Sequence, residues 1–378
     1  MSRVDLSTEA KQTFQVVGLL ATLLVIGIHY KSDIPDSPVL AESTSNELWQ
    51  DYLFGGLARV AVPIFAFAAG LFYFRSGDNS LRSHRSKLAK RTRTLLVPYL
   101  LVGAIATTCW LLVNTIEGTP VQLNWLGYLS VWLLHPPAEQ LWFLRDLFFL
   151  VLLAPAIHWC VSHHKIGNWF VGAVLLIWML EWQPFPIVQG WYLINIETFT
   201  FFVFGCFATR HYWAFESIGR QPLKGVTLLT AGWLLLVLIR VLSRPDFDIW
   251  YSRNCGVIDL LAHKTSILIG CVALFQISWR LRSKWVLYWS SASFFVYLIH
   301  EFPLRAAIEK VCEKFVPVEY TLWPTLPMVI IVCFGAAYVM NRYAPFFTGL
   351  LSGGRVLPAS NKKIPPAESP QITKQATR

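Results

Sequence analysis

Apolar residues recur in long, nearly uninterrupted runs along almost the whole chain, and short polar stretches separate them. A helix needs about 20 apolar residues to cross the hydrocarbon core of a bilayer. Lipid offers no partner for free backbone groups, so each run is expected to be a helix. The pattern predicts an all-α polytopic membrane protein, a bundle of about ten transmembrane helices over residues 13–30, 51–74, 95–116, 141–161, 167–182, 191–208, 225–243, 256–278, 285–302 and 322–341.

Composition agrees with this pattern, since 55% of the residues are hydrophobic and only 14% are charged. A soluble domain carries about a quarter charged residues. The deficit excludes a large soluble domain, a disordered protein and a disulfide-stapled secreted module. The seven cysteines show no metal-ligand spacing, and only Cys255 and Cys312 are expected on one non-cytoplasmic face, where they could form a disulfide. No signal-peptide cleavage site follows the first run, which we interpret as the first span.

Basic residues set the expected orientation. Of the 32 Lys and Arg residues, 22 fall in one set of alternating loops and termini and 6 in the other. Basic loops stay at the cytoplasmic face, so both termini are expected in the cytoplasm and the protein in the cytoplasmic membrane. The net charge of +10 then reflects topology and not a nucleic-acid partner. Residues 1–347 are expected to form the membrane domain, and residues 348–378 a disordered basic cytoplasmic tail.

Ionisable residues inside the predicted spans gather toward one leaflet. Such groups are costly in a bilayer, so each is a functional hypothesis by default. The expected orientation places them toward the outer face, which predicts a polar cavity that opens outward. Some of them could instead lie at the interface or snorkel, although Arg59, within the apolar LARVAVPIF, fits that alternative poorly. The candidates are His29, Arg59, Arg145, Asp146, Glu197, Asp259, His263, Lys264, His300 and Glu301.

A basic cluster lies at the opposite face, between the second and third predicted spans. Its last members, Lys90, Arg91 and Arg93, directly precede the third span. Guanidinium groups suit phosphate oxygens, and a helix start adds a favourable dipole. The cluster predicts a site for the phosphates of a cytosolic donor, with plain topological anchoring as the alternative.

Five segments resemble the acyltransferase-3 family of integral membrane O-acyltransferases. The resemblance covers roughly residues 13–342. It implies transfer of an acyl group, commonly acetyl, from acyl-CoA to a hydroxyl of a carbohydrate or lipid-linked glycan, as in polysaccharide O-acetylation. The segments are VVGLLATLLVIGIHY, RVAVPIFAFAAGLFYF, KRTRTLLVPYL, LWFLRDLFFLVLLAP and SASFFVYLIHEFPL.

The resemblance also implies roles for individual residues. His29 falls on the family's catalytic histidine, and Arg91 on the first member of an arginine pair associated with the CoA donor. Histidine is suited to act as a general base at neutral pH, and Arg59 is a candidate to stabilise the oxyanion. Lys90 and Arg93 would complete the donor site, and no metal is expected. The candidates for the acceptor cavity are Trp142, Arg145, Asp146, Glu197 and His300, of which Asp146 or Glu197 could orient the base.

Two positions depart from the family's pattern. The family usually has arginine eleven residues before its histidine, where this chain has Gly18. The second arginine of its pair falls on Thr94, with Arg93 one residue early. Lys11, Lys90 and Arg93 are candidates to compensate.

Other functions stay open at this stage. Charged residues inside a helix bundle also suit a transporter or flippase, although transporter sites lie near the midplane and this charge lies to one side. Gly18 is compatible with a catalytically silent relative. His300 either lines the acceptor cavity or ends the ninth span before Pro303. The Trp and Tyr residues near span ends fit interfacial belts or sugar stacking.

Overall fold

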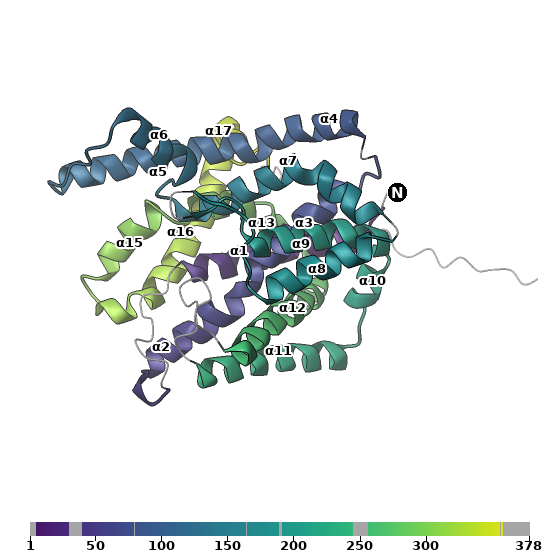
Figure 1. Cartoon of the computed structure of the whole chain (residues 1–378). Helices are drawn as coiled ribbons and strands as arrows, with labels where there is room; N and C mark the ends of the chain where they lie inside the picture. The colour runs from purple at the N-terminus through teal and green to yellow at the C-terminus, as the bar shows by residue number, and fades with distance from the viewer. Residues whose placement is uncertain are drawn as a thin grey trace, which may run out of the picture.

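The computed structural model describes residues 5–29, 40–78, 80–163, 165–188, 191–244, 256–355 and 357. Helices occupy each of the ten predicted segments and pack as one bundle (Figure 1). Among the described residues, seven helical stretches are long and apolar enough to cross a membrane. They are Thr8–Ile28 (α1), Ser45–Phe74 (ending in α3), Leu81–Ile116 (α4 and α5), Glu139–Ser162 (containing α7), Leu223–Ser243 (α11), Val257–Arg280 (α12) and Leu322–Tyr343 (α16).

Three of these stretches contain local changes of helix type. A π-helical turn and a 3-10 turn follow α2, and another π-helical turn joins α4 to α5. Such turns are frequent at functional positions, and here they carry Asp51, Arg59 and Arg93. The segments are α2 (Ser45–Gln50), Asp51–Gly56, Leu57–Val60, α3 (Ala61–Phe74), α4 (Leu81–Arg91), Thr92–Leu96, α5 (Val97–Ile116), Glu139–Leu141 and α7 (Trp142–Ser162).

The remaining predicted segments hold shorter helices. The ninth is divided by a turn into two short helices, and His300 directly follows the second. Two two-residue strands pair antiparallel before α9, within a fold that is otherwise helical. The elements are α8 (Gly167–Met179), β1 (Ile187–Val188), β2 (Trp191–Tyr192), α9 (Ile196–Ala208), α10 (Ala214–Gly219), α13 (Lys284–Ser290), α14 (Ser293–Ile299), α15 (Leu304–Cys312) and α17 (Pro345–Leu351), with 3-10 turns at Leu40–Glu42, Thr209–His211 and Val318–Tyr320.

Several helices lie between the predicted spans, and the apolar one among them is α6. The helix α6 (Trp125–Leu134) is apolar, but its ten residues are too few to show as a span. It packs on α5: the Tyr99 hydroxyl donates to the Leu133 carbonyl at 2.7 Å, and Trp132 Nε1 donates to the Leu100 carbonyl at 2.9 Å.

The core forms around α1 and a close α3–α9 pair. A Cβ atom added at Gly70 would lie 2.2 Å from the Phe202 carbonyl oxygen, and one added at Gly205 would lie 2.2 Å from that of Phe67. Glycine therefore lets the two backbones approach, as small residues do between membrane helices. The helix α1 contacts α3, α12 and α14, so its buried residues face the middle of the bundle.

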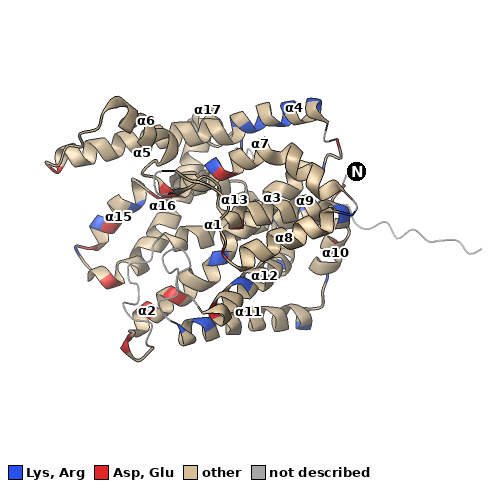
Figure 2. Ribbon diagram, viewed as in Figure 1, with Lys and Arg blue, Asp and Glu red and all other residues tan. Residues whose placement is uncertain are grey.

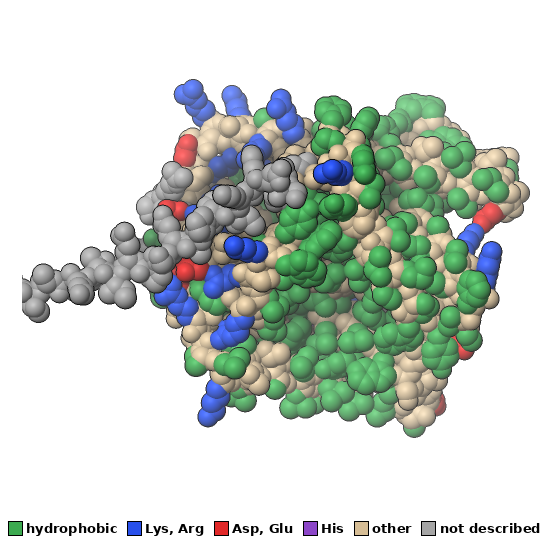
Figure 3. Space-filling view, turned by 180° about the vertical axis from the view of Figure 1, so that it is seen from behind, with side chains coloured by type: hydrophobic (Ala, Val, Ile, Leu, Met, Phe, Trp, Pro, Cys, Tyr) green, Lys and Arg blue, Asp and Glu red, His purple; other side chains and the backbone are tan. Residues whose placement is uncertain are grey.

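Charge divides between the two ends of the bundle. Lys and Arg dominate α4, whereas acidic and basic residues mix around α2, α11 and α15 (Figure 2). Between these ends the surface is largely hydrophobic (Figure 3), as expected for a lipid-facing belt. This arrangement is that of a multi-pass membrane protein.

The C-terminal region differs in part from the predicted tail. Residues 348–351 form the end of α17, because the apolar run PFFTGLL begins with proline at a helix start and buries Thr348. The described chain continues to residue 355, and residue 357 is buried. Residues 358–378 of the predicted tail lie outside the described residues.

Candidate active site

Two histidines that are far apart in sequence meet inside the bundle. His29 ends α1 and His300 ends α14, and their ring centroids are 5.6 Å apart. His300 is fully buried, and its Nδ1 lies 2.8 Å from the Tyr297 carbonyl oxygen. Because a carbonyl only accepts, Nδ1 donates, which leaves Nε2 as the unprotonated nitrogen of the neutral ring.

Arg59 lies in the same region as this histidine pair. It is half-buried in the 3-10 turn before α3. Its positive charge lies within electrostatic range of the His29 ring and the Glu197 carboxyl group. The 3-10 turn that carries Arg59 packs against α1, the helix that His29 ends, and the catalytic roles of both residues remain predictions.

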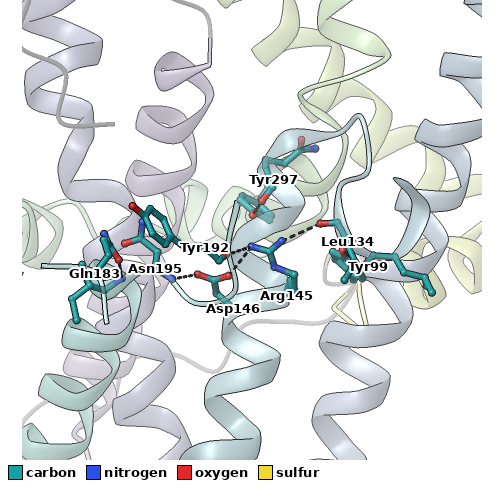
Figure 4. A network of polar contacts seen from close by, with 11 residues as sticks. Tyr99, Leu134, Arg145, Asp146, Gln183, Tyr192, Asn195 and Tyr297 are labelled. Carbon is teal, nitrogen blue, oxygen red and sulfur yellow. Dashed lines mark hydrogen bonds and ion pairs between the residues drawn. The ribbon is translucent and has the colours of Figure 1, made fainter. Parts of the chain in front are cut away.

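Arg145 and Asp146 form a second polar network at the start of α7 (Figure 4). The Arg145 guanidinium donates to the Leu134 carbonyl at 3.0 Å and to the Tyr192 carbonyl at 2.8 Å, and it contacts Asp146 at 3.3 Å. The other Asp146 oxygen accepts the Asn195 backbone N–H at 2.8 Å. The pair thus connects the start of α7 to the end of α6, to β2 and to the start of α9.

Glu197 belongs to a different cluster. Its carboxylate accepts from Trp178 Nε1 at 3.1 Å and lies 4.0 Å from Lys264 Nζ. Lys264 is 1% exposed, pairs with Glu181 and lies 4.6 Å from the centroid of the Trp178 ring. The structure therefore divides the predicted acceptor-cavity residues among three groups: His300 beside His29, Arg145 with Asp146, and Glu197 with Lys264. Trp142 packs against the Phe143 ring.

A cavity of about 540 Å³ extends from the basic end of the protein into the bundle. Arg91 and Arg355 line it, and so do Thr22 of α1 and Tyr297 of α14. Thr22 lies seven residues before His29, which is about 10 Å along a helix. Most other lining residues are apolar, with Phe and Leu prominent.

Tyr297 connects this cavity to the histidine pair. Its ring centroid is 5.9 Å from that of His300, and its hydroxyl donates to the Gln140 carbonyl. Gln140 in turn donates to the Leu298 carbonyl at 3.0 Å, which holds α14 against the start of α7. Tyr297 could not be predicted from the sequence as a site residue, because it lies in an apolar run and carries no charge.

The predicted donor cluster faces two different spaces. Arg91 lines the central cavity, whereas Lys90 and Arg93 line a neighbouring groove of about 720 Å³. Thr94 and Gly353 line the same groove. The three basic residues are thus near each other, but only Arg91 reaches the interior.

A buried ion pair, which the sequence did not predict, joins two other elements of the bundle. Asp51 and Arg240, each 1% exposed, are joined by contacts of 2.8 and 3.2 Å. Arg240 could be noticed as a charged residue within an apolar run, but nothing in the sequence indicates that Asp51 is its partner.

The other predicted contacts are only partly described. Asp259, one of the candidate ionisable residues, lies 3.9 Å from Arg244. Cys255 lies outside the described residues, and Cys312 Sγ lies 3.9 Å from Met328 Sδ. Within the described residues, no group of three His, Cys, Asp or Glu side chains is arranged to hold a metal ion.

Comparison with known proteins agrees with the resemblance. A family model described as an acyltransferase domain, of the acyltransferase-3 type, matches residues 18–342. The succinoglycan biosynthesis protein ExoH of Rhizobium meliloti (strain 1021) is 25% identical over 364 residues, which cover 90% of this chain and 92% of that protein. No solved structure matches the chain.

Proposed function

Because the chain belongs to the acyltransferase-3 family of membrane acyltransferases, we propose that it transfers an acyl group, acetyl in the simplest case, from cytosolic acyl-CoA to a hydroxyl of a carbohydrate. The observation that carries this proposal is the cavity that begins at Arg91 and ends at Tyr297, beside the His29–His300 pair. A donor that is anionic at one end and reactive at the other needs a site of this form.

The donor enters from the basic end. Lys90, Arg91 and Arg93 bind its phosphates, because guanidinium and ammonium groups pair with phosphate oxygens. The pantetheine arm lies along the apolar cavity, so that the thioester approaches Tyr297. The hydrophobic lining excludes water, which protects the thioester from hydrolysis.

The reaction is nucleophilic substitution at the thioester carbonyl. His29 takes the proton of the acceptor hydroxyl while the oxygen attacks the carbonyl carbon. Arg59 stabilises the oxyanion of the tetrahedral intermediate. Its collapse breaks the carbon–sulfur bond and releases CoA, whose thiolate takes up the proton that His29 holds.

The acceptor reaches His29 from the other face of the membrane. The ExoH relative is a succinoglycan biosynthesis protein by name, which supports a polysaccharide or lipid-linked glycan as acceptor. Trp142, Arg145, Asp146, Glu197 and His300 then shape its entry. This arrangement requires about ten crossings of the cytoplasmic membrane with both termini in the cytoplasm.

Purified protein in lipid nanodiscs tests the proposal. The chain should release CoA thiol from acetyl-CoA in the presence of a glycan acceptor, and His29→Ala should reduce the rate by about 10²-fold or more without loss of acetyl-CoA binding. His163→Ala, at an exposed position after α7, is the matched control. Full transfer activity of His29→Ala would contradict the assignment of His29 as the catalytic base. A wild-type protein that neither binds nor consumes acetyl-CoA would contradict the acyltransferase function, and this is the result expected of a transporter.

A further inference from the structure

Arg355, which follows the last helix, enters the same cavity as Arg91. We propose that Arg355 is a donor-binding residue, and that its guanidinium and that of Arg91 hold the diphosphate of acyl-CoA between them at the cytoplasmic mouth of the cavity. This inference rests on the proposed function and identifies a residue outside the basic cluster before α5. It also gives the segment after α17 a place in the site.

The backbone on both sides of Arg355 is fixed against the membrane domain. Gly353 has a φ of +61°, and a Cβ added there would lie 2.6 Å from Thr94 Cα, so the turn packs directly on the π-helical turn that follows Arg91. The Leu357 backbone exchanges two hydrogen bonds with the Asn341 side chain, at 3.2 and 3.3 Å. Arg355 is therefore held at the cavity between two anchored residues.

The charge balance of the cavity favours an anion. Among the described residues, neither Arg91 nor Arg355 forms an ion pair with a carboxylate, and no acidic side chain lines the cavity. Arg355 lies 4.0 Å from the centroid of the Phe294 ring, which positions its guanidinium. Burial and the charge of Arg91 lower the pKa of Arg355 to about 10, so it stays protonated at neutral pH. Two buried like charges repel each other, and a diphosphate between them removes that cost.

A polar group farther inside the cavity also points to a ligand. Ser293 lines the cavity and is 6% exposed, and its hydroxyl has no hydrogen-bond partner among the described residues. A buried polar group without a partner is costly. The amide groups of a pantetheine arm that starts at Arg355 and runs toward Tyr297 would supply one.

The test compares two donors in nanodiscs. Acetyl-CoA carries the phosphates, whereas S-acetylpantetheine carries the same thioester and arm without them. We expect Arg355→Ala to weaken acetyl-CoA binding about tenfold or more and to leave S-acetylpantetheine binding unchanged. The acetyl-CoA affinity of Arg355→Lys should lie between those of Arg355→Ala and the wild type. Arg342→Ala, an exposed arginine just before α17, should bind both donors as the wild type does.

The outcomes separate this inference from the proposed function. Equal acetyl-CoA affinity of Arg355→Ala and Arg342→Ala would overturn the role of Arg355 while leaving the acyltransferase intact. An equal loss for both donors would also overturn it, because the variant would then disturb the cavity and not phosphate binding. A loss seen only in nanodiscs with phosphatidylglycerol would assign Arg355 to a lipid headgroup. Failure of the wild type to bind acetyl-CoA would instead contradict the proposed function itself.

Discussion

A single hydrogen bond defines what His300 can do. Its Nδ1–H donates to the Tyr297 carbonyl, and its ring lies 5.6 Å from that of His29. This bond would be present whether His300 only ends α14 or also faces the reaction. The two roles differ in whether Nε2 is used. A role in the reaction needs its lone pair, whereas a residue that only ends the helix does not.

Substitution of His300 by asparagine separates these roles. The Asn amide can still donate to the Tyr297 carbonyl, but it offers no nitrogen lone pair in place of Nε2. We expect His300→Asn to keep the wild-type melting temperature and acetyl-CoA affinity and to lower kcat about 10- to 100-fold, a loss of general-base or orienting chemistry. Wild-type kcat in this variant would leave His300 only its structural role.

The buried Asp51–Arg240 pair determines a second prediction. Removal of one partner leaves an uncompensated buried charge, which typically costs about 3–5 kcal/mol. We expect Asp51→Asn and Arg240→Met each to lower the melting temperature in detergent by several degrees. The double variant should lose less than the sum of the single losses, because neither charge is then left alone. Arg244→Met, at a more exposed position, is the control, and strictly additive losses would contradict the coupling.

How far the site could be predicted follows from these residues. His29, Arg59 and Arg145 could be identified because a charge or an imidazole in an apolar run is expensive. The buried ion pair could not be predicted, since Asp51 and Arg240 are 189 positions apart and pairing over such distances depends on the packing of helices. Tyr297 and Gln140 could not be found because neither is charged.

At the level of helices, length decided which elements the sequence could predict. Long apolar runs such as Thr8–Ile28 and Val257–Arg280 gave correct helices, because only a helix satisfies its backbone in lipid. The short α6 was missed, and the segment 285–302 became α13 and α14. The return of the chain after α17 to the start of α5 is a tertiary contact, and local pattern does not encode it.

The Gly353 turn is the element that holds Arg355. A methyl group at Gly353 would collide with the Thr94 backbone, and its φ of +61° disfavours other residues. We expect Gly353→Ala to displace the segment and weaken acetyl-CoA binding as Arg355→Ala does. Gly335→Ala, in α16 with open space at its Cβ, should bind normally. Normal binding by Gly353→Ala would show that the turn does not position the donor site.

A compensating substitution elsewhere in the cavity lining can test the role of Arg355. Gly18 of α1 lines the central cavity, and no atom lies within 4 Å of a Cβ added there. A guanidinium placed at this position has room to extend into the cavity. We expect Gly18→Arg to restore part of the acetyl-CoA affinity lost in Arg355→Ala, measured by titration in nanodiscs. Gly232 of α11 also has open space at its Cβ, so Gly232→Arg is the control. Equal recovery of acetyl-CoA affinity in this variant would show that the effect of Gly18→Arg does not depend on its place in the cavity.

For the whole molecule, the two ends carry different chemistry across an apolar belt (Figures 2 and 3). Arg91 and Arg355 lie at one end of the cavity, and Tyr297 at the other contacts His300. In the proposed function, a donor bound through its phosphates would therefore stay on the basic side while its acyl group reaches the histidine pair. The acceptor need not meet the cytosol.

This division predicts that transfer is sided. Acetyl-CoA does not cross a bilayer, so inside-out vesicles that contain the protein should consume it from the bulk solution, whereas right-side-out vesicles should not until they are permeabilised. The positive-inside rule gives the physical reason, because it predicts that the basic α4 segment stays at the cytoplasmic face. The measurement is the release of CoA thiol. Lys90→Ala and Arg91→Ala should reduce this release in inside-out vesicles, because both variants bind the donor more weakly. Equal consumption by sealed vesicles of both orientations would contradict the sidedness.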